Sequence, residues 1–198
     1  MWAPYDEETY AFVLAHIGPQ DVVLDIGAGD LRLTFRLAQR VKTVYAIELQ
    51  PQLVAYGLRR HRMPTNVHVI VGDARLFPFP RDVTIGVLLM RHCPDVGLYV
   101  EKLRQAGASA LITNARWRLG PEVITLNTER LPFEAVSMGW YACQCGATGF
   151  VSGPPEALDE DVYTRIHEVA YCPSCHPTSM DAKLTDAAGL SLYAHQIS

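Results

Sequence analysis

Residues 22–48 read VVLDIGAGDLRLTFRLAQRVKTVYAIE, and this stretch decides the fold. An apolar run at its start leads into a turn that contains Gly27 and Gly29. Residues 31–40 then alternate apolar and charged side chains at helical spacing, and a second apolar run ends on Glu48. A strand, a glycine turn, a helix and a second strand together form one βαβ unit.

The turn and the end of the second strand both carry groups that suit a nucleoside. Gly27 and Gly29 have no Cβ, so a ligand can approach the backbone closely. Because the turn opens a helix, we expect its N–H groups to face the ligand. Glu48 follows Gly29 by 19 residues, and an acid at that position can accept two hydrogen bonds from a ribose diol.

The residues around the turn help to decide which nucleoside-containing cofactor it binds. A dinucleotide-binding turn would carry a third glycine where this chain has Arg32, which weakens the NAD alternative. Asp25 and Asp30 flank the turn, and two carboxylates suit a ligand with an ammonium and a sulfonium group better than a diphosphate. S-adenosylmethionine carries both cations. A tight strand–helix turn without any ligand is the remaining alternative.

At these residues the chain resembles the class I S-adenosylmethionine-dependent methyltransferases. Residues 23–29 are similar to the first motif of that family, Glu48 to its ribose-binding acid, and residues 69–74 to its adenine-binding segment. In the family the acid of this segment binds the exocyclic amine of adenine, and the next N–H meets the ring. The resemblance implies that the cofactor is bound by Asp25, Gly27, Ala28, Gly29, Glu48, Leu49, Asp73 and Ala74.

The rest of the chain continues the alternation of strands and helices. The patterns predict helices over residues 6–17, 51–62 and 95–105, and strands over residues 67–71, 83–90 and 108–113. This order gives an α/β fold, a doubly wound Rossmann-like methyltransferase sheet with ligands at the carboxyl ends of its strands. Further strands are expected over residues 123–126, 133–142, 162–171 and 190–197, two of them finishing the sheet as an antiparallel edge.

Five cysteines in 198 residues indicate metal binding or chemistry rather than disulfides. Two tight turns could supply four thiolates to one tetrahedral zinc ion, by way of Cys143, Cys145, Cys172 and Cys175. His176 or His167 could replace one cysteine, and a redox dithiol or unrelated buried thiols are the alternatives. The arrangement resembles a zinc ribbon, and a closed site of four protein ligands is structural. We therefore predict a methyltransferase domain over residues 1–139 and a small β-rich zinc-binding module over residues 140–198.

The segment after residues 83–90 should carry the chemistry. His92 is the candidate general base, because the pKa of an unperturbed histidine lies near neutrality. Cys93 precedes a proline, the reverse of the Pro-Cys step of cytosine methyltransferases, and is expected to be a buried, inert thiol. Residues 47–51 and 72–77 are similar to ribosomal RNA adenine dimethylases, but Arg91-His92-Cys93-Pro94 stands where those enzymes have Asn/Asp-Pro-Pro-Tyr.

Composition limits the partners. The net charge of −4 divides into +3 over residues 1–118 and −7 over residues 119–198, so the appended module is acidic and does not favour nucleic acid. The chain has no run of 18 apolar residues and no signal-peptide start, so a cytoplasmic protein without a membrane span is expected. The predicted function is methyl transfer to an unidentified small molecule, RNA or protein. The alternative is an inactive S-adenosylmethionine-binding regulatory or interaction protein with a structural zinc.

Overall fold

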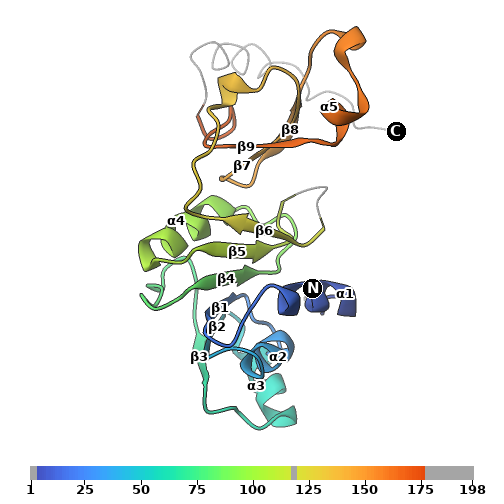
Figure 1. Cartoon of the computed structure of the whole chain (residues 1–198). Coiled ribbons are helices and arrows are strands. Elements are labelled where there is room, and N and C mark those ends of the chain that lie inside the picture. Colours follow the sequence, from blue (N-terminus) through green and yellow to red (C-terminus); the bar gives the residue numbers. More distant parts are fainter. Residues whose placement is uncertain (1–3, 117–119, 177–198) are drawn as a thin grey trace, which may run out of the picture. The chain divides into compact units, whose positions relative to one another are not determined.

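A computed structural model describes residues 4–116 and 120–176 of the chain. The chain forms two compact units that divide between Glu129 and Arg130. The first unit contains a six-stranded sheet of order β3-β2-β1-β4-β5-β6, in which all neighbours pair in parallel except β5 and β6 (Figure 1). Its strands are β1 (Val22–Ile26), β2 (Thr43–Glu48), β3 (Val67–Val71), β4 (Ile85–Leu88), β5 (Ala110–Thr113) and β6 (Glu122–Thr125).

The helices of this unit lie where the sequence patterns predict them, one before β1 and the others between strands. They are α1 (Glu7–Ala15), α2 (Arg32–Ala38), α3 (Pro51–Arg60) and α4 (Val96–Ala106). The Asp6 side chain caps α1 by accepting a hydrogen bond from the Thr9 N–H, and Pro51 occupies the first turn of α3, where its missing N–H costs nothing. Gly107 ends α4 with a φ of 91°, a conformation that glycine adopts without strain.

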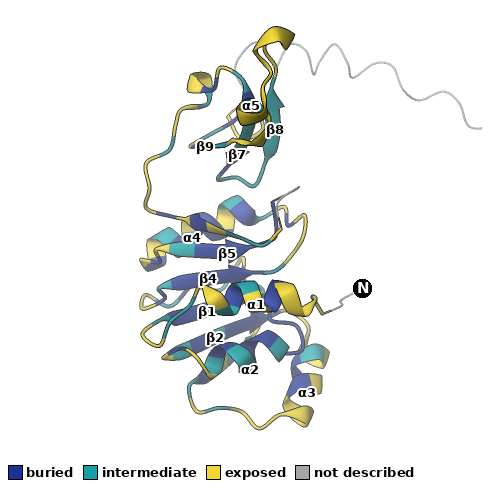
Figure 2. Ribbon diagram, turned by 45° about the vertical axis from the view of Figure 1, so that its right-hand side comes forward, coloured by how far each residue is buried: buried dark blue, intermediate teal, exposed yellow. Residues whose placement is uncertain are grey.

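The sheet buries both of its faces. Tyr10 and Val13 of α1 pack with α2 residues against one face, while Tyr99 and Leu103 of α4 pack against the other. Strands β1 and β4 are buried along their whole length, as Figure 2 shows in dark blue. Because helices cover both faces of the sheet, the sequences of these two strands are almost continuously apolar.

The second unit has its own sheet and core. Its strands are β7 (Gly139–Cys143), β8 (Thr148–Val151) and β9 (Ile166–Val169), in the order β8-β7-β9. A short helix, α5 (Glu160–Thr164), precedes β9, and two 3₁₀ turns, η1 (Phe133–Ala135) and η2 (Pro155–Ala157), lie between strands. The core contains Val136, Cys143, Val169 and Cys172.

Two strand predictions in this unit are wrong in extent. Residues 133–142 were expected to form one strand beside β6, but η1 occupies their first part and only β7 is extended, in the second sheet. Pro132 stands before η1 and cannot donate a ladder hydrogen bond. Residues 162–171 include the end of α5, which Asp159 caps through the Val162 N–H, and only β9 is extended. The expected strand over residues 190–197 lies outside the described residues.

The units divide ten residues before the predicted domain boundary at residue 139. Leu131 explains the shift, because it forms a bridge with Val169 of β9 and so ties the preceding segment to the second unit. Among the described residues, no helix is long and apolar enough to cross a membrane.

Candidate functional site

The glycine turn is folded back on the end of β2. Gly27 and Gly29 have φ values of 76° and 58°, which glycine adopts at no steric cost. The N–H groups of Gly27 and Ala28 both donate to the Ile47 carbonyl, at 2.8 and 3.0 Å. The expectation that these N–H groups face a ligand is therefore wrong, because the neighbouring strand already accepts their hydrogen bonds. With these two N–H groups already used, the turn is less suited to a diphosphate.

Glu48 is held at the sheet edge by two backbone hydrogen bonds. Its side chain is buried, and one carboxylate oxygen accepts the Gly29 N–H at 2.8 Å while the other accepts the Gln50 N–H at 2.8 Å. A carboxylate oxygen can accept more than one hydrogen bond, so each oxygen keeps capacity for a hydroxyl. The Glu48 side chain thus joins the glycine turn directly to the end of β2.

A cavity of about 910 Å³ opens beside Glu48 at the carboxyl ends of the parallel strands. Five of the predicted cofactor-binding residues line it, namely Gly27, Glu48, Leu49, Asp73 and Ala74. Asp25 and Ala28 line a much smaller hollow that shares Tyr5 and Gly27 with the cavity. Gly29 lines neither and acts through its hydrogen bond to Glu48.

The two acids beside the turn differ in their partners. Asp30 forms an ion pair of 2.9 Å with Arg32, the residue that replaces the third glycine. Asp25 is buried and accepts a hydrogen bond of 2.7 Å from the Thr34 hydroxyl. Burial raises the pKa of Asp25 to about 6, the Thr34 hydrogen bond opposes this shift, and the negative charge of Glu48 adds to it. The negative charge of Asp25 is therefore unfavourable in the folded protein.

The unfavourable charge of Asp25 predicts how the stability of Asp25→Asn differs from that of the wild type as the pH changes. The folded pKa of about 6 lies above the ordinary value of 3.8, so the wild type loses stability as the pH rises through this window. The asparagine cannot ionise, and its amide oxygen can still accept from Thr34. Urea unfolding measures the free energy of unfolding of both proteins. The variant should become more stable than the wild type by up to about 3 kcal/mol as the pH rises from 4 to 7. A stability difference that does not change with pH would contradict the raised pKa of Asp25.

Arg75 lines the cavity beside Asp73 and was not among the predicted site residues. The Arg75 guanidinium donates to both oxygens of the Asp73 carboxylate, at 2.7 to 3.1 Å, and the backbone N–H of Arg75 donates to the same carboxylate at 2.9 Å. The Arg75 hydrogen bonds lower the pKa of Asp73. A ligand that binds Asp73 must share this carboxylate with Arg75. The sequence pattern Asp-x-Arg could have indicated this pair, because a turn brings the side chains of residues two apart into contact.

The other end of the cavity is formed by residues 4–6, which precede α1, and by the segment after β4. The Tyr5 hydroxyl accepts the Arg91 N–H at 3.1 Å, and the Arg91 guanidinium lies 5.6 Å from the centre of the Tyr5 ring. Met90, Arg91 and Asp95 line the cavity, whereas His92 does not. His92 is exposed and has a φ of 59°, an uncommon conformation for a residue with a side chain. Its neighbour Cys93 is buried, and burial raises the pKa of that thiol.

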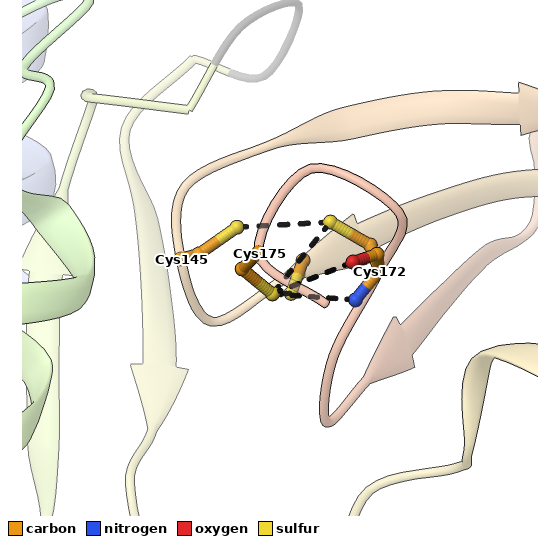
Figure 3. Close-up of side chains that lie close together, drawn as sticks. Cys145, Cys172 and Cys175 are labelled. Atoms are coloured by element: carbon orange, nitrogen blue, oxygen red, sulfur yellow. Dashed lines mark hydrogen bonds between the residues drawn. The ribbon is translucent and has the colours of Figure 1, made fainter. Parts of the chain in front are cut away.

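The second unit brings the four remaining cysteines together. The sulfur atoms of Cys143, Cys145, Cys172 and Cys175 all lie within 4.8 Å of one another, and the pairs Cys143–Cys175 and Cys145–Cys172 are 3.7 Å apart (Figure 3). Four thiolates around zinc at about 2.3 Å would be separated by about 3.8 Å, whereas a disulfide needs about 2.05 Å. Two tight turns orient these side chains. The Gly146 N–H donates to the Cys143 carbonyl, and the Cys175 N–H donates to the Cys172 carbonyl. His167 and His176 are not members of this sulfur cluster.

Comparisons with known proteins agree with the geometry of the first unit. Residues 23–109 match the family model described as a methyltransferase domain. A probable ribosomal RNA small subunit methyltransferase A of Methanosarcina barkeri is 52% identical over 66 residues, 33% of this chain and 23% of that protein. A probable cobalt-precorrin-6B C(15)-methyltransferase (decarboxylating) of Methanothermobacter thermautotrophicus is 41% identical over 64 residues, 31% of this chain and 33% of that protein.

The solved structures show the fold. A precorrin-6y C5,15-methyltransferase of Geobacter metallireducens superposes with a TM-score of 0.50 at 17% identity, over 57% of this chain and 64% of that one. The matched segments span no more than a third of the two sequence relatives. Sequence motif, sheet order and family model agree that the chain contains a class I S-adenosylmethionine-dependent methyltransferase domain.

Proposed function

We propose that this protein transfers the methyl group of S-adenosylmethionine to an acceptor that is a small molecule, an RNA or a protein. The observation that carries the proposal is the buried carboxylate of Glu48, fixed by two backbone N–H groups at the wall of a 910 Å³ cavity. Its position at the end of β2 suits a ribose diol, and the cavity leaves room beyond the nucleoside for a second molecule.

Each predicted residue receives a role in this proposal. Gly27, Ala28 and Gly29 form the turn beneath the cofactor, and Glu48 accepts the ribose hydroxyls. Leu49, which is 61% exposed, offers an apolar surface to the adenine. Asp73 accepts the exocyclic amine beside Arg75, and the Ala74 N–H meets the ring. Asp25 supplies the negative potential that favours the ammonium and sulfonium groups.

Methyl transfer needs mainly alignment, because the sulfonium is already reactive. The cavity supplies proximity. His92 is our proposed proton acceptor for an O–H, N–H or S–H nucleophile. Its exposed ring lies outside the cavity wall, so this role requires the segment after β4 to turn the ring inward when the acceptor binds.

This role predicts the effect of His92→Ala. Turnover should fall about a hundredfold because the transition state loses its proton acceptor, while the affinity for S-adenosylhomocysteine stays the same. The matched control is His68→Ala, which removes another exposed histidine, in β3. Steady-state kinetics and calorimetry of both variants check the prediction. Equal turnover in the two variants would leave His92 without a catalytic role.

The acceptor can be found by an assay that does not presume its class. Purified protein is incubated with methyl-labelled S-adenosylmethionine and, in turn, with tetrapyrrole precursors, ribosomal RNA and protein extracts. Transfer of label to one class identifies the acceptor. The names of the relatives place ribosomal RNA and precorrins first in such a panel.

The alternative function is an inactive protein that binds S-adenosylmethionine and regulates a partner. One observation favours it: residues 91–94, Arg-His-Cys-Pro, do not match the Asn/Asp-Pro-Pro-Tyr motif that holds an amine in adenine methyltransferases. Stabilisation by S-adenosylhomocysteine but not by NAD in a thermal-shift experiment supports both functions. Label transfer separates them, since only the enzyme turns over.

We further propose that the second unit holds one structural zinc ion. The sulfur separations match a tetrahedral thiolate site, and all four ligands come from the protein, so no position is left for a substrate. Burial raises the pKa of the Cys145 thiol to about 11, and a bound cation would offset the cost of burying the thiolates.

A further inference from the structure

Lys102 of α4 makes an unusually complete set of contacts with residues 73–77, the segment after β3. Its ammonium donates to the Ala74 carbonyl at 2.5 Å, to the Phe77 carbonyl at 2.7 Å and to the Arg75 carbonyl at 3.0 Å. An ammonium has three N–H donors, and all three are used here. The Phe79 ring centre lies 4.4 Å from the same nitrogen.

Residues 73–77 form one turn that cannot satisfy these carbonyls by itself. The Leu76 and Phe77 N–H groups both donate to the Asp73 carbonyl, at 3.0 Å each. The three carbonyls that follow converge on one point, like the carbonyls at the end of a helix, where a cation is favoured. Lys102 provides the cation, and burial lowers the pKa of its ammonium.

We infer that Lys102 is a positioning residue of the adenine subsite: it holds the turn that places the Asp73 carboxylate and the Ala74 N–H. This inference rests on the proposed function, because the cavity must take an adenine for the turn to matter. Lys102 itself does not line the cavity. Its effect on the ligand is indirect, through three backbone hydrogen bonds.

The chain offers a matched control on the same helix. Arg104 of α4 donates from Nε to the Leu126 carbonyl at 2.9 Å, and so ties α4 to the end of β6 rather than to the cofactor cavity. Arg104→Met and Lys102→Met each replace a cation by an unbranched apolar side chain. Both should destabilise the fold, and only Lys102→Met should affect the ligand.

The experiment compares two ligands by calorimetric titration of the full chain. S-adenosylhomocysteine contains adenine, and S-ribosylhomocysteine has the same ribose and amino acid without the base. Lys102→Met should bind S-adenosylhomocysteine about tenfold or more weakly than the wild type, because it loses charge-assisted hydrogen bonds that fix the turn. Its affinity for S-ribosylhomocysteine should not change, and Arg104→Met should bind both ligands like the wild type.

Three results would overturn the inference. Unchanged affinity of Lys102→Met for S-adenosylhomocysteine would contradict it while leaving the proposed function intact. Equal losses for the two ligands would show general destabilisation instead of positioning. A wild type that binds no S-adenosylhomocysteine would refute the proposed function and this inference together. If Lys102→Met does not fold, Lys102→Gln gives the same test, since a neutral amide with two N–H donors cannot satisfy three carbonyls.

Discussion

Glu48→Ala should bind S-adenosylhomocysteine at least about a hundredfold more weakly than the wild type. The variant loses a buried carboxylate that is proposed to accept two hydrogen bonds from the ribose, and charge-assisted bonds contribute about 1.5 kcal/mol or more each. It also removes the acceptor of the Gly29 and Gln50 N–H groups, so the glycine turn loses its tie to β2. Isothermal calorimetry measures the effect directly.

Two further variants separate ribose binding from loss of structure. Glu48→Gln keeps the size of the side chain but carries one oxygen and no charge, so its loss of affinity should lie between those of wild type and alanine. Glu101→Ala removes an exposed glutamate of α4 and should bind like the wild type. A folded Glu48→Ala protein with undiminished affinity would remove Glu48 from the site, and with it the main argument for the cofactor.

The wild type should contain one zinc ion per chain, and Cys172→Ser should contain none. Structural zinc binds to zinc-finger peptides with apparent free energies of about 10–16 kcal/mol, so the loss of one of four ligands should weaken zinc binding strongly. Cys172 is buried among Val136, Cys143 and Val169, and a hydroxyl in its place would also disturb this small core. Elemental analysis of protein prepared without chelators gives the stoichiometry.

Cys93→Ser is the matched control, because Cys93 is the buried cysteine of the first unit and belongs to a different core. It should keep its zinc. Metal-free wild type with four or five freely reacting thiols would contradict the zinc proposal.

Chelation should affect the two units differently. The sheet of the first unit has its own apolar clusters, built from β1, β4, β5 and their helices, and does not need the metal to fold. Removal of zinc should therefore accelerate amide exchange in β7 and β9 while S-adenosylhomocysteine still binds. Loss of ligand binding on chelation would show that the metal supports the cofactor site and would contradict this division.

The sequence predicts the first unit well because its signals are local and strong. The glycine turn, Glu48 at a strand end and the apolar runs of β1 and β4 each specify their element from a few neighbouring residues. The antiparallel edge strand β6 was also anticipated. In the second unit β8 was not predicted, because Thr148–Val151 is short and half-buried without a clear alternation.

The sequence could not reveal which groups of the site are already occupied. The N–H groups of Gly27 and Ala28 are used by Ile47, the Asp73 carboxylate by Arg75, and the residue 73–77 carbonyls by Lys102. These pairings depend on how strands, turns and α4 meet in space. Lys102 follows Ala74 by 28 residues, a separation at which no local pattern indicates contact.

The most direct test of the account is an experimental structure of the protein with S-adenosylhomocysteine bound. The account predicts the ribose hydroxyls on the Glu48 carboxylate, the adenine amine on Asp73 beside Arg75, and the homocysteine end towards Asp25. Density for the ligand elsewhere, or a ribose that does not contact Glu48, would contradict the proposed cofactor site.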